Sequence, residues 1–408
     1  MHAPNRKTKR NGFDRIKDRT VLLDQYQAAA RRTDQNRAKG LAGLAFPLLG
    51  LFGEVGTLLS ALKKKQRDQA SYAGYSDAVI EEFGDVLWYF SNIASRASLK
   101  LSVLAQLVSR GLDNWANVEV QHFGAFGDLQ RRKNKHGSPD SPEFESALIA
   151  LAGKVGLLLN DFSLGKVATN RDALSANLVE IFRALIEAAN VADVDLQIAA
   201  ARNVEKINSR WPIDRIYQPL FDQGFPSSEQ LPRKIEIEIV EEEIRGKFYV
   251  VQRLKGVKLG SRLTDNKLAP DDYRFHDVFH LAYAAILGWS PVSRALLKMK
   301  RKSQPHIDEA QDGARAILIE EGISTFIFHH ALRLNYFAPI QALDYPLLKT
   351  VQDFVRGFEV DQCPLWQWEK AILDGFKVFR RLQVQRRGII VADLVKRSIT
   401  FKAHPDDR

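Results

Sequence analysis

The chain has a single cysteine among its 408 residues, Cys363, which excludes an internal disulfide. No uninterrupted run approaches the ~18 apolar residues that a membrane-spanning helix needs. The first nineteen residues are polar and basic, so a secretory apolar segment is missing as well. We therefore expect a soluble cytoplasmic protein without a membrane partner. With 45% hydrophobic and 26% charged residues, the chain can build two or three domains with cores of their own.

Several functional motifs are also missing. There is no glycine-rich phosphate loop, no Ser/His/Asp or Cys/His nucleophile system, and no zinc finger, helix-turn-helix or RNA-binding fingerprint. The net charge of +10 is consistent with nucleic-acid contact, but no motif supports that interpretation. Attraction of anionic nucleotides explains the charge equally well, and we favour it.

The spacing of hydrophobic residues, together with breaks rich in proline and glycine, predicts a mainly α fold. Helical patterns dominate from Val21 to Val118, and the segment 211–232, rich in proline, glycine and serine, has the strongest boundary signal. Alternating β-branched residues predict a β-hairpin over 234–251, with a final strand pair near 389–391 and 399–401. The predicted units are a basic flexible arm at 1–20, a first helical repeat at 21–125, a second repeat at 143–215 and an α-rich C-terminal domain at 230–408.

Two predicted amphipathic helices carry acidic residues at matching places, in L-F-G-E-V-G and in E-E-F-G-D-V-L-W-Y; these residues are Glu54, Glu81, Glu82 and Asp85. Glu82 and Asp85 stand three apart and therefore share a helical face, whereas Glu81 points about 100° away from Glu82. We expect Gly53 and Gly56 to allow close helix approach. Carboxylates from two helices suit Mg²⁺, although a solvated face of ordinary helices is the alternative.

At these residues the chain resembles the all-α nucleoside triphosphate pyrophosphohydrolases of the MazG and dimeric dUTPase/dCTPase type, whose signature is E-x-x-E, a spacer and E-x-x-D. Glu54, Glu82 and Asp85 match three of its four metal positions, and Thr57 at the fourth is a neutral, weaker ligand. The resemblance implies hydrolysis of nucleoside triphosphates to a monophosphate and pyrophosphate. Mg²⁺ is the implied cofactor, with Mn²⁺ as an alternative, and Glu81 or Glu54 would accept the proton of the attacking water.

The pattern recurs one hundred positions later in L-A-G-K-V-G, with Lys154 in place of Glu54. Glu180 and Arg183 then stand where the first copy has Glu82 and Asp85. A repeat at a fixed offset indicates duplication, so we expect the copies to pair as a pseudo-dimer. The basic residues at Lys154 and Arg183 exclude an equivalent metal site in the second copy.

The second copy ends in A-R-N-V-E-K, similar to the closing N-x-x-K helix of the family, whereas the first copy has Arg110 to Trp115 at that place. We therefore expect a composite site in which the first copy supplies the acids and the second copy contacts the phosphates. Drift in a scaffold repeat is the alternative. The candidate substrate-binding residues are Lys154, Asn203, Lys206 and Trp88, the last as a stacking surface for the base.

The C-terminal domain, to which we assign no family, contains His276-Asp-x-x-His280, with two imidazoles on one helical face. A carboxylate from the downstream pair Glu320-Glu321 would complete a second, transition-metal site, and helix packing is the alternative. A basic segment, Arg294 with Lys298 to Lys302, is a candidate polyanion surface.

Three functions follow. The first is the pyrophosphohydrolase, the second a non-catalytic nucleotide sensor that controls a C-terminal effector, and the third a metal-dependent hydrolase centred on the His/Glu cluster. Homo-oligomers are compatible with all three.

Overall fold

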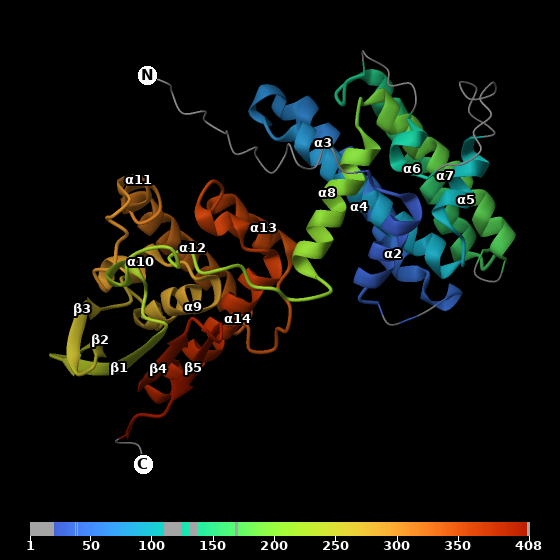
Figure 1. The fold of residues 1–408 in the computed structure, drawn as a ribbon. Coiled ribbons are helices and arrows are strands. Elements are labelled where there is room, and N and C mark those ends of the chain that lie inside the picture. The colour runs from blue at the N-terminus through green and yellow to red at the C-terminus, as the bar shows by residue number, and fades with distance from the viewer. Residues whose placement is uncertain are drawn as a thin grey trace, which may run out of the picture. The chain divides into compact units, whose positions relative to one another are not determined.

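The structure is a computed structural model that describes residues 20–36, 38, 40–109, 124–130, 137–167 and 170–405. The chain divides into two compact units, Met1–Pro212 and Ile213–Arg408 (Figure 1). The fold is mainly α, with one small antiparallel sheet in the second unit. The predicted basic arm, apart from Thr20, and the segment 110–115 lie outside the described residues.

The described part of unit 1 is mainly helical, with one isolated β-bridge between Leu22 and Ala125. Capping side chains set several helix starts: the hydroxyl of Ser141 accepts from Phe144 N ahead of Pro142, and Asn170 and Asp195 begin the next two helices in the same way. The helices are α2 (Leu23–Thr33), α3 (Ala45–Asp68), α4 (Tyr75–Arg96), α5 (Leu101–Ser109), α6 (Pro142–Ser163), α7 (Arg171–Val191) and α8 (Leu196–Arg210).

The helices of unit 1 pack reciprocally. The α3–α4 hairpin and the α6–α7 hairpin lie against each other through α3 and α6. The helix after each hairpin then crosses to the other one, so that α8 packs on α4 and α5 packs on α7 (Figure 1). A single hydrophobic core, from Val21 to Ala201, joins both copies. Neither hairpin buries its apolar face alone.

Two glycines permit this close packing, and they are not the predicted ones. A Cβ on Gly84 of α4 would lie 2.9 Å from the Ala199 carbonyl oxygen of α8, and a Cβ on Gly50 would lie 2.0 Å from the Tyr89 ring. Gly53 and Gly56 face open space instead. The prediction of close approach at Gly53 and Gly56 is therefore wrong, because those positions lie on the exposed face of α3.

The exposed faces of α3 and α6 are unusually apolar. Leu49 is 67% exposed on α3, and Leu157 is 63% exposed on α6. By length and composition, the segment Ala45–Ser71 and the helix Pro142–Ser163 would be long and apolar enough to cross a membrane, a test that core helices also pass. Uninterrupted apolar runs, on which the sequence expectation relied, do not detect this property.

Unit 2 contains an antiparallel sheet of order β3-β2-β1-β4-β5. The predicted hairpin forms its first two strands, and the predicted final strand pair joins the same sheet through β1 and β4. Ile235, Ile237 and Ile239 point to the buried face of the sheet, and α9 and α14 pack on β4 and β5.

The elements of unit 2 have the following bounds. The strands are β1 (Lys234–Ile244), β2 (Lys247–Leu254), β3 (Val257–Leu263), β4 (Arg387–Asp393) and β5 (Ser398–Lys402). The helices are α9 (Asp277–Leu287), α10 (Pro291–Leu296), α11 (Pro305–Ala310), α12 (Ala314–Leu332), α13 (Tyr345–Phe354) and α14 (Leu365–Gln385).

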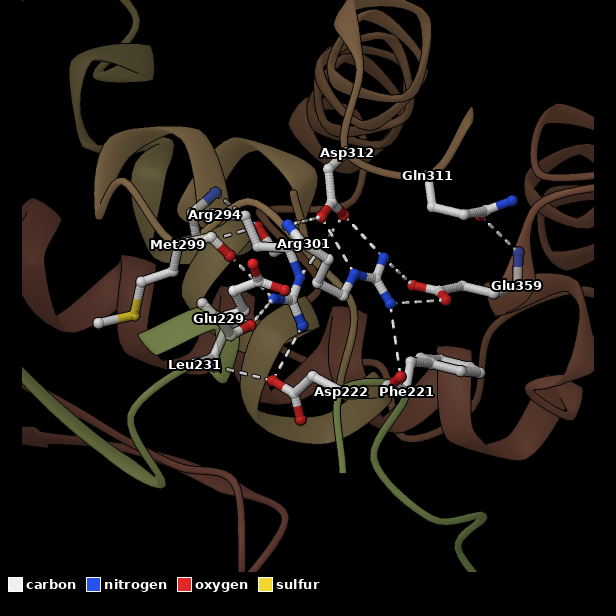
Figure 2. Close-up of polar contacts among 12 residues, drawn as sticks. Phe221, Asp222, Glu229, Leu231, Arg294, Met299, Arg301, Gln311, Asp312 and Glu359 are labelled. Carbon is white, nitrogen blue, oxygen red and sulfur yellow. Dashed lines mark hydrogen bonds and ion pairs between the residues drawn. The ribbon is translucent and has the colours of Figure 1, made fainter. Parts of the chain in front are cut away.

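A buried ionic network ties the first segment of unit 2 to its helices (Figure 2). Arg294 donates to Asp222 over 2.9 Å, and Arg301 donates to Asp312 over 2.7 Å and to Glu359 over 2.7 Å. Burial would lower the pKa of Arg301, but its bonds to Asp312 and Glu359 raise it above its ordinary value. The predicted polyanion surface is therefore wrong for Arg294 and Arg301, which are buried and paired.

Candidate functional site

The acidic residues of the first copy converge between α3 and α4. Carboxylate oxygens of Glu54, Glu82 and Asp85 lie within 4.8 Å of one another, and all three residues are half-buried. Glu54 comes from α3, whereas Glu82 and Asp85 lie one turn apart on α4. Thr57, at the fourth family position, is exposed and donates its hydroxyl to the Gly53 carbonyl oxygen over 3.1 Å.

This cluster holds more negative charge than its surroundings balance. Burial, followed by the charges of Asp85 and Glu54, raises the pKa of Glu82 to about 8. Burial and Asp85 also raise the pKa of Glu54 above its ordinary value. Carboxyl groups whose pKa is raised by burial and by neighbouring like charges indicate a place where a cation would bind.

Two residues of α8 reach the cluster from the second copy. Asn203 Nδ2 donates to Asp85 Oδ1 over 2.9 Å, and Lys206 Nζ donates to Asp85 Oδ2 over 2.6 Å. Lys206 also donates to Glu81 Oε1 over 3.1 Å. Burial would lower the pKa of Lys206, but Asp85 and Glu81 raise it, so the ammonium group stays charged.

Sequence reasoning missed Tyr26, which lies under this contact. Its hydroxyl lies 2.9 Å from Asn203 Oδ1 and 3.1 Å from the Gly84 carbonyl oxygen, and the residue is 1% exposed. The phenol thereby fixes the Asn203 amide with its NH₂ group towards Asp85. A lone tyrosine on an amphipathic helix gives no sequence signal of this role.

Two predicted substrate-binding residues have other contacts. Lys154 Nζ bonds Glu180 Oε2 over 3.0 Å within the second copy, so the structure does not join it to the acidic cluster. Trp88 donates its indole N–H to Thr33 Oγ1 over 3.0 Å and meets the Tyr89 ring edge-on. Its ring is half-buried.

In the second copy, Glu180 occupies the repeat position of Glu82, but its charge is balanced by basic residues. A shallow groove of about 440 Å³ lies between α5 and α7, where the first copy has its α8–α4 contact; its lining residues are Leu107, Asp172, Ser175, Ala176, Val179 and Glu180. Glu180 bonds Lys154 and Arg183, and the bond from Lys154 holds its pKa below the ordinary value. Glu180 therefore has two cations bonded to it, whereas the charges closest to Glu82 include those of Asp85 and Glu54.

The predicted histidine pair of unit 2 also lies within one group. Ligand atoms of His276, Asp277 and His280 lie within 4.8 Å of one another. His280 Nε2 lies 3.5 Å from Glu321 Oε1, and His276 Nε2 lies 3.8 Å from Glu321 Oε2. Burial lowers the pKa of His276, while Glu320 raises that of His280 despite its burial.

Of the two predicted glutamates, only Glu321 faces the Nε2 atoms. Glu320 is fully buried and accepts from His280 Nδ1 over 2.9 Å, from Ser290 Oγ over 2.7 Å and from Val292 N over 2.8 Å. The sequence analysis left open which of the two glutamates would complete the site, and Glu321 is the one that lies near both Nε2 atoms. Adjacent residues on α12 point in different directions, and Glu320 faces the core.

Fold and sites define a two-unit protein: a helical bundle with an acidic cluster, and an α/β unit with a histidine–carboxylate group. Residues 216–405 match the family model described as the MazG C-terminal domain. The chain is also 32% identical over 90 residues to the Gene 37 protein of Mycobacterium phage L5, an alignment that covers 21% of this chain and 79% of that relative. No solved structure matches the chain.

The C-terminal part of the chain is therefore related to MazG, and the chain belongs to the same family as the phage Gene 37 protein. The family model covers the C-terminal part, to which the sequence analysis assigned no family. It does not extend to the N-terminal half, where the MazG-type motif was recognised.

Proposed function

We propose that unit 1 is a magnesium-dependent nucleoside triphosphate pyrophosphohydrolase, which cleaves between the α- and β-phosphates and releases a nucleoside monophosphate and pyrophosphate. The observation that carries this proposal is the raised pKa of Glu82, about 8, within a cluster of three carboxylates. The relation to MazG supports nucleotide chemistry in general.

Magnesium fits the donor set because Mg²⁺ prefers carboxylate oxygens and keeps part of its water shell. Glu54, Glu82 and Asp85 would hold the ion. The ion would supply positive charge to the substrate phosphates and lower the pKa of a water molecule. Mn²⁺ is the alternative ion for the same oxygens.

The surrounding residues of the chain have separate tasks in this proposal. Glu54 accepts the proton of the attacking water, since a raised pKa makes a carboxylate a better proton acceptor. Glu81 is less suited to that task because Lys206 holds one of its oxygens. Lys206 and Asn203 turn from Asp85 to the phosphates, and the half-buried face of Trp88 offers a surface for the base.

The test is incubation of the full chain with each of the common ribo- and deoxyribonucleoside triphosphates and Mg²⁺. We expect equal amounts of pyrophosphate and nucleoside monophosphate, and no product when a chelator is present. Release of orthophosphate would contradict the proposed bond cleavage.

One observation favours a second candidate, a nucleotide sensor without turnover. Thr57 lies outside the carboxylate cluster, so the site has three acids where the family signature has four. In that case calorimetry would detect magnesium-dependent nucleotide binding while pyrophosphate release stays at background. The C-terminal unit would then act as the effector.

A further inference from the structure

We propose that unit 2 binds a transition-metal ion of the zinc class through His276, His280, Asp277 and Glu321. The first three lie at the start of α9, and Glu321 lies on α12. This site is independent of the acidic cluster in unit 1, with different ligands and a different preferred ion.

The ring of His276 is held in the orientation that a metal ligand needs. Its Nδ1 lies 2.8 Å from the Tyr273 carbonyl oxygen, which can only accept, so Nδ1 carries the hydrogen. Neutral His276 therefore presents a lone pair at Nε2. The ring also stacks on Tyr273, with centroids 4.3 Å apart and the planes 1° from parallel. Rotation of the ring would break both contacts.

His280 is held in the same way by Glu320. Glu320 accepts from Ser290 Oγ and Val292 N, and the same carboxylate accepts from His280 Nδ1. A carboxylate behind a histidine is the usual support of a metal-bound imidazole, because it fixes the ring and increases the basicity of the free nitrogen. Both histidines thus turn Nε2 to the same place, with ring centroids 5.6 Å apart.

The second ring nitrogen of His280, Nε2, forms no well-aligned hydrogen bond within the described residues, and its nearest carboxylate oxygen, Glu321 Oε1, is 3.5 Å away. His280 is 2% exposed, and its Nε2 is one of the buried polar atoms without a hydrogen bond in the described part of the chain. Gln252, which donates to Asp277, leaves its buried Oε1 unpaired too. Buried polar atoms without partners are costly. An ion bound at His280 Nε2 would remove this cost.

The charge of the proposed ligands and their donor atoms indicate which metal ion the site would bind. A metal ion binds imidazole in its neutral form. With both histidines neutral, Asp277 and Glu321 would give the site two negative charges, which a divalent ion balances. Imidazole with carboxylate suits Zn²⁺, Fe²⁺ or Ni²⁺, whereas Mg²⁺ prefers oxygen ligands alone. The Glu321 side chain is 39% exposed, so solvent reaches the site from that side and water can complete the coordination.

The experiment uses the full chain, stripped with a chelator and titrated with Zn²⁺ and with Co²⁺ in excess Mg²⁺. Calorimetry gives stoichiometry and affinity, and the visible absorption of Co²⁺ reports ligation by nitrogen. We expect one ion per chain, and binding weakened about 100-fold or more by His276→Ala and by His280→Ala. Glu82→Gln in unit 1 should leave this binding unchanged.

The matched control is His329→Ala on α12, because that imidazole is exposed and bonds only a carbonyl of its own helix in the described structure, over 2.9 Å. It should bind the ion as the wild type does. Glu321→Gln is a second ligand variant on the solvent side, where loss of folding is not expected, and it should weaken binding at least about tenfold. A wild type that takes up no Zn²⁺ or Co²⁺, or His280→Ala and Glu321→Gln variants that match the His329→Ala affinity, would overturn the proposal.

Discussion

Asn203 on α8 donates to Asp85 on α4 over 2.9 Å, although 118 positions separate the two residues in the chain. The contact joins the second helical copy to the acidic motif of the first. Gly84 makes it possible, because any side chain there would collide with Asn203. The acids and the amide therefore form one site only in the folded, paired bundle.

Replacing Glu82 by glutamine should lower kcat/KM for pyrophosphate release by about 10²–10³-fold, since it removes a charged ligand worth several kcal/mol. Glu180→Gln is the matched control, at the same repeat position in the second copy, where Lys154 and Arg183 already balance the charge. Equal losses in both variants would show that the site does not lie at Glu82.

The stability of unit 1 without divalent ions should fall as the pH rises. The folded-state pKa of Glu82 is about 8, above its ordinary value of 4.5, so its protonated form favours folding at low pH. This contribution is complete below pH 4.5 and is lost as the pH rises through 8. Thermal melts from pH 5 to 9 should show a falling Tm, by ~2–4 °C per kcal/mol lost, and Mg²⁺ should restore it. A Tm independent of both pH and Mg²⁺ would contradict the charge assignment.

Lys206→Gln should raise the KM for nucleotide and lower kcat, because it removes the ammonium group beside Asp85 and Glu81. Lys154→Gln should change neither constant, since Lys154 bonds Glu180 within the second copy. Steady-state kinetics of the two variants test which lysine contacts the phosphates. A larger effect at position 154 would show that Lys154, rather than Lys206, contacts the phosphates.

Thr57→Glu should bind Mg²⁺ more tightly with equal or higher turnover. Position 57 lies one turn after Glu54 and is exposed, so a carboxylate there has no burial cost and can turn towards the cluster. Magnesium titration by calorimetry measures the gain. Weaker binding together with lower activity would mean that the Thr57 hydroxyl has a role of its own.

Asp312→Ala should destabilise unit 2 by about 3–5 kcal/mol, because it leaves the buried Arg301 partly unpaired. Asp353→Ala is the control, since its pair with Arg356 is solvent-exposed and exposed pairs contribute about 0–1 kcal/mol. Urea unfolding followed by circular dichroism compares the two. Similar small changes in both variants would mean that Glu359 alone can hold Arg301.

Local patterns predicted much of this fold. The helical repeats and the alternating strands are local properties, as is the spacing of Glu82 and Asp85, and the structure places them accordingly. The edge strand β3 was not predicted, because its residues are mostly exposed and lack alternation. The choice between Glu320 and Glu321 depends on which side of α12 faces the core, and a pair of adjacent acids does not reveal it.

The contacts that were missed join distant parts of the chain. Arg301 meets Glu359, and Tyr26 meets Asn203, across 58 and 177 positions. Neither pair has a spacing that a periodic pattern could detect. The basic segment was misread for the same reason, since the acids that neutralise it come from other elements.

The exchange of α5 and α8 between the two hairpins has a consequence for how the site assembles. When two separate chains supply the halves of a site, dilution separates them and the site is lost. Here a covalent link keeps Lys206 near Asp85 at a high effective concentration, whatever the abundance of the protein. The second hairpin can then lose its acids without cost to the first, because its remaining task is to keep α8 in place.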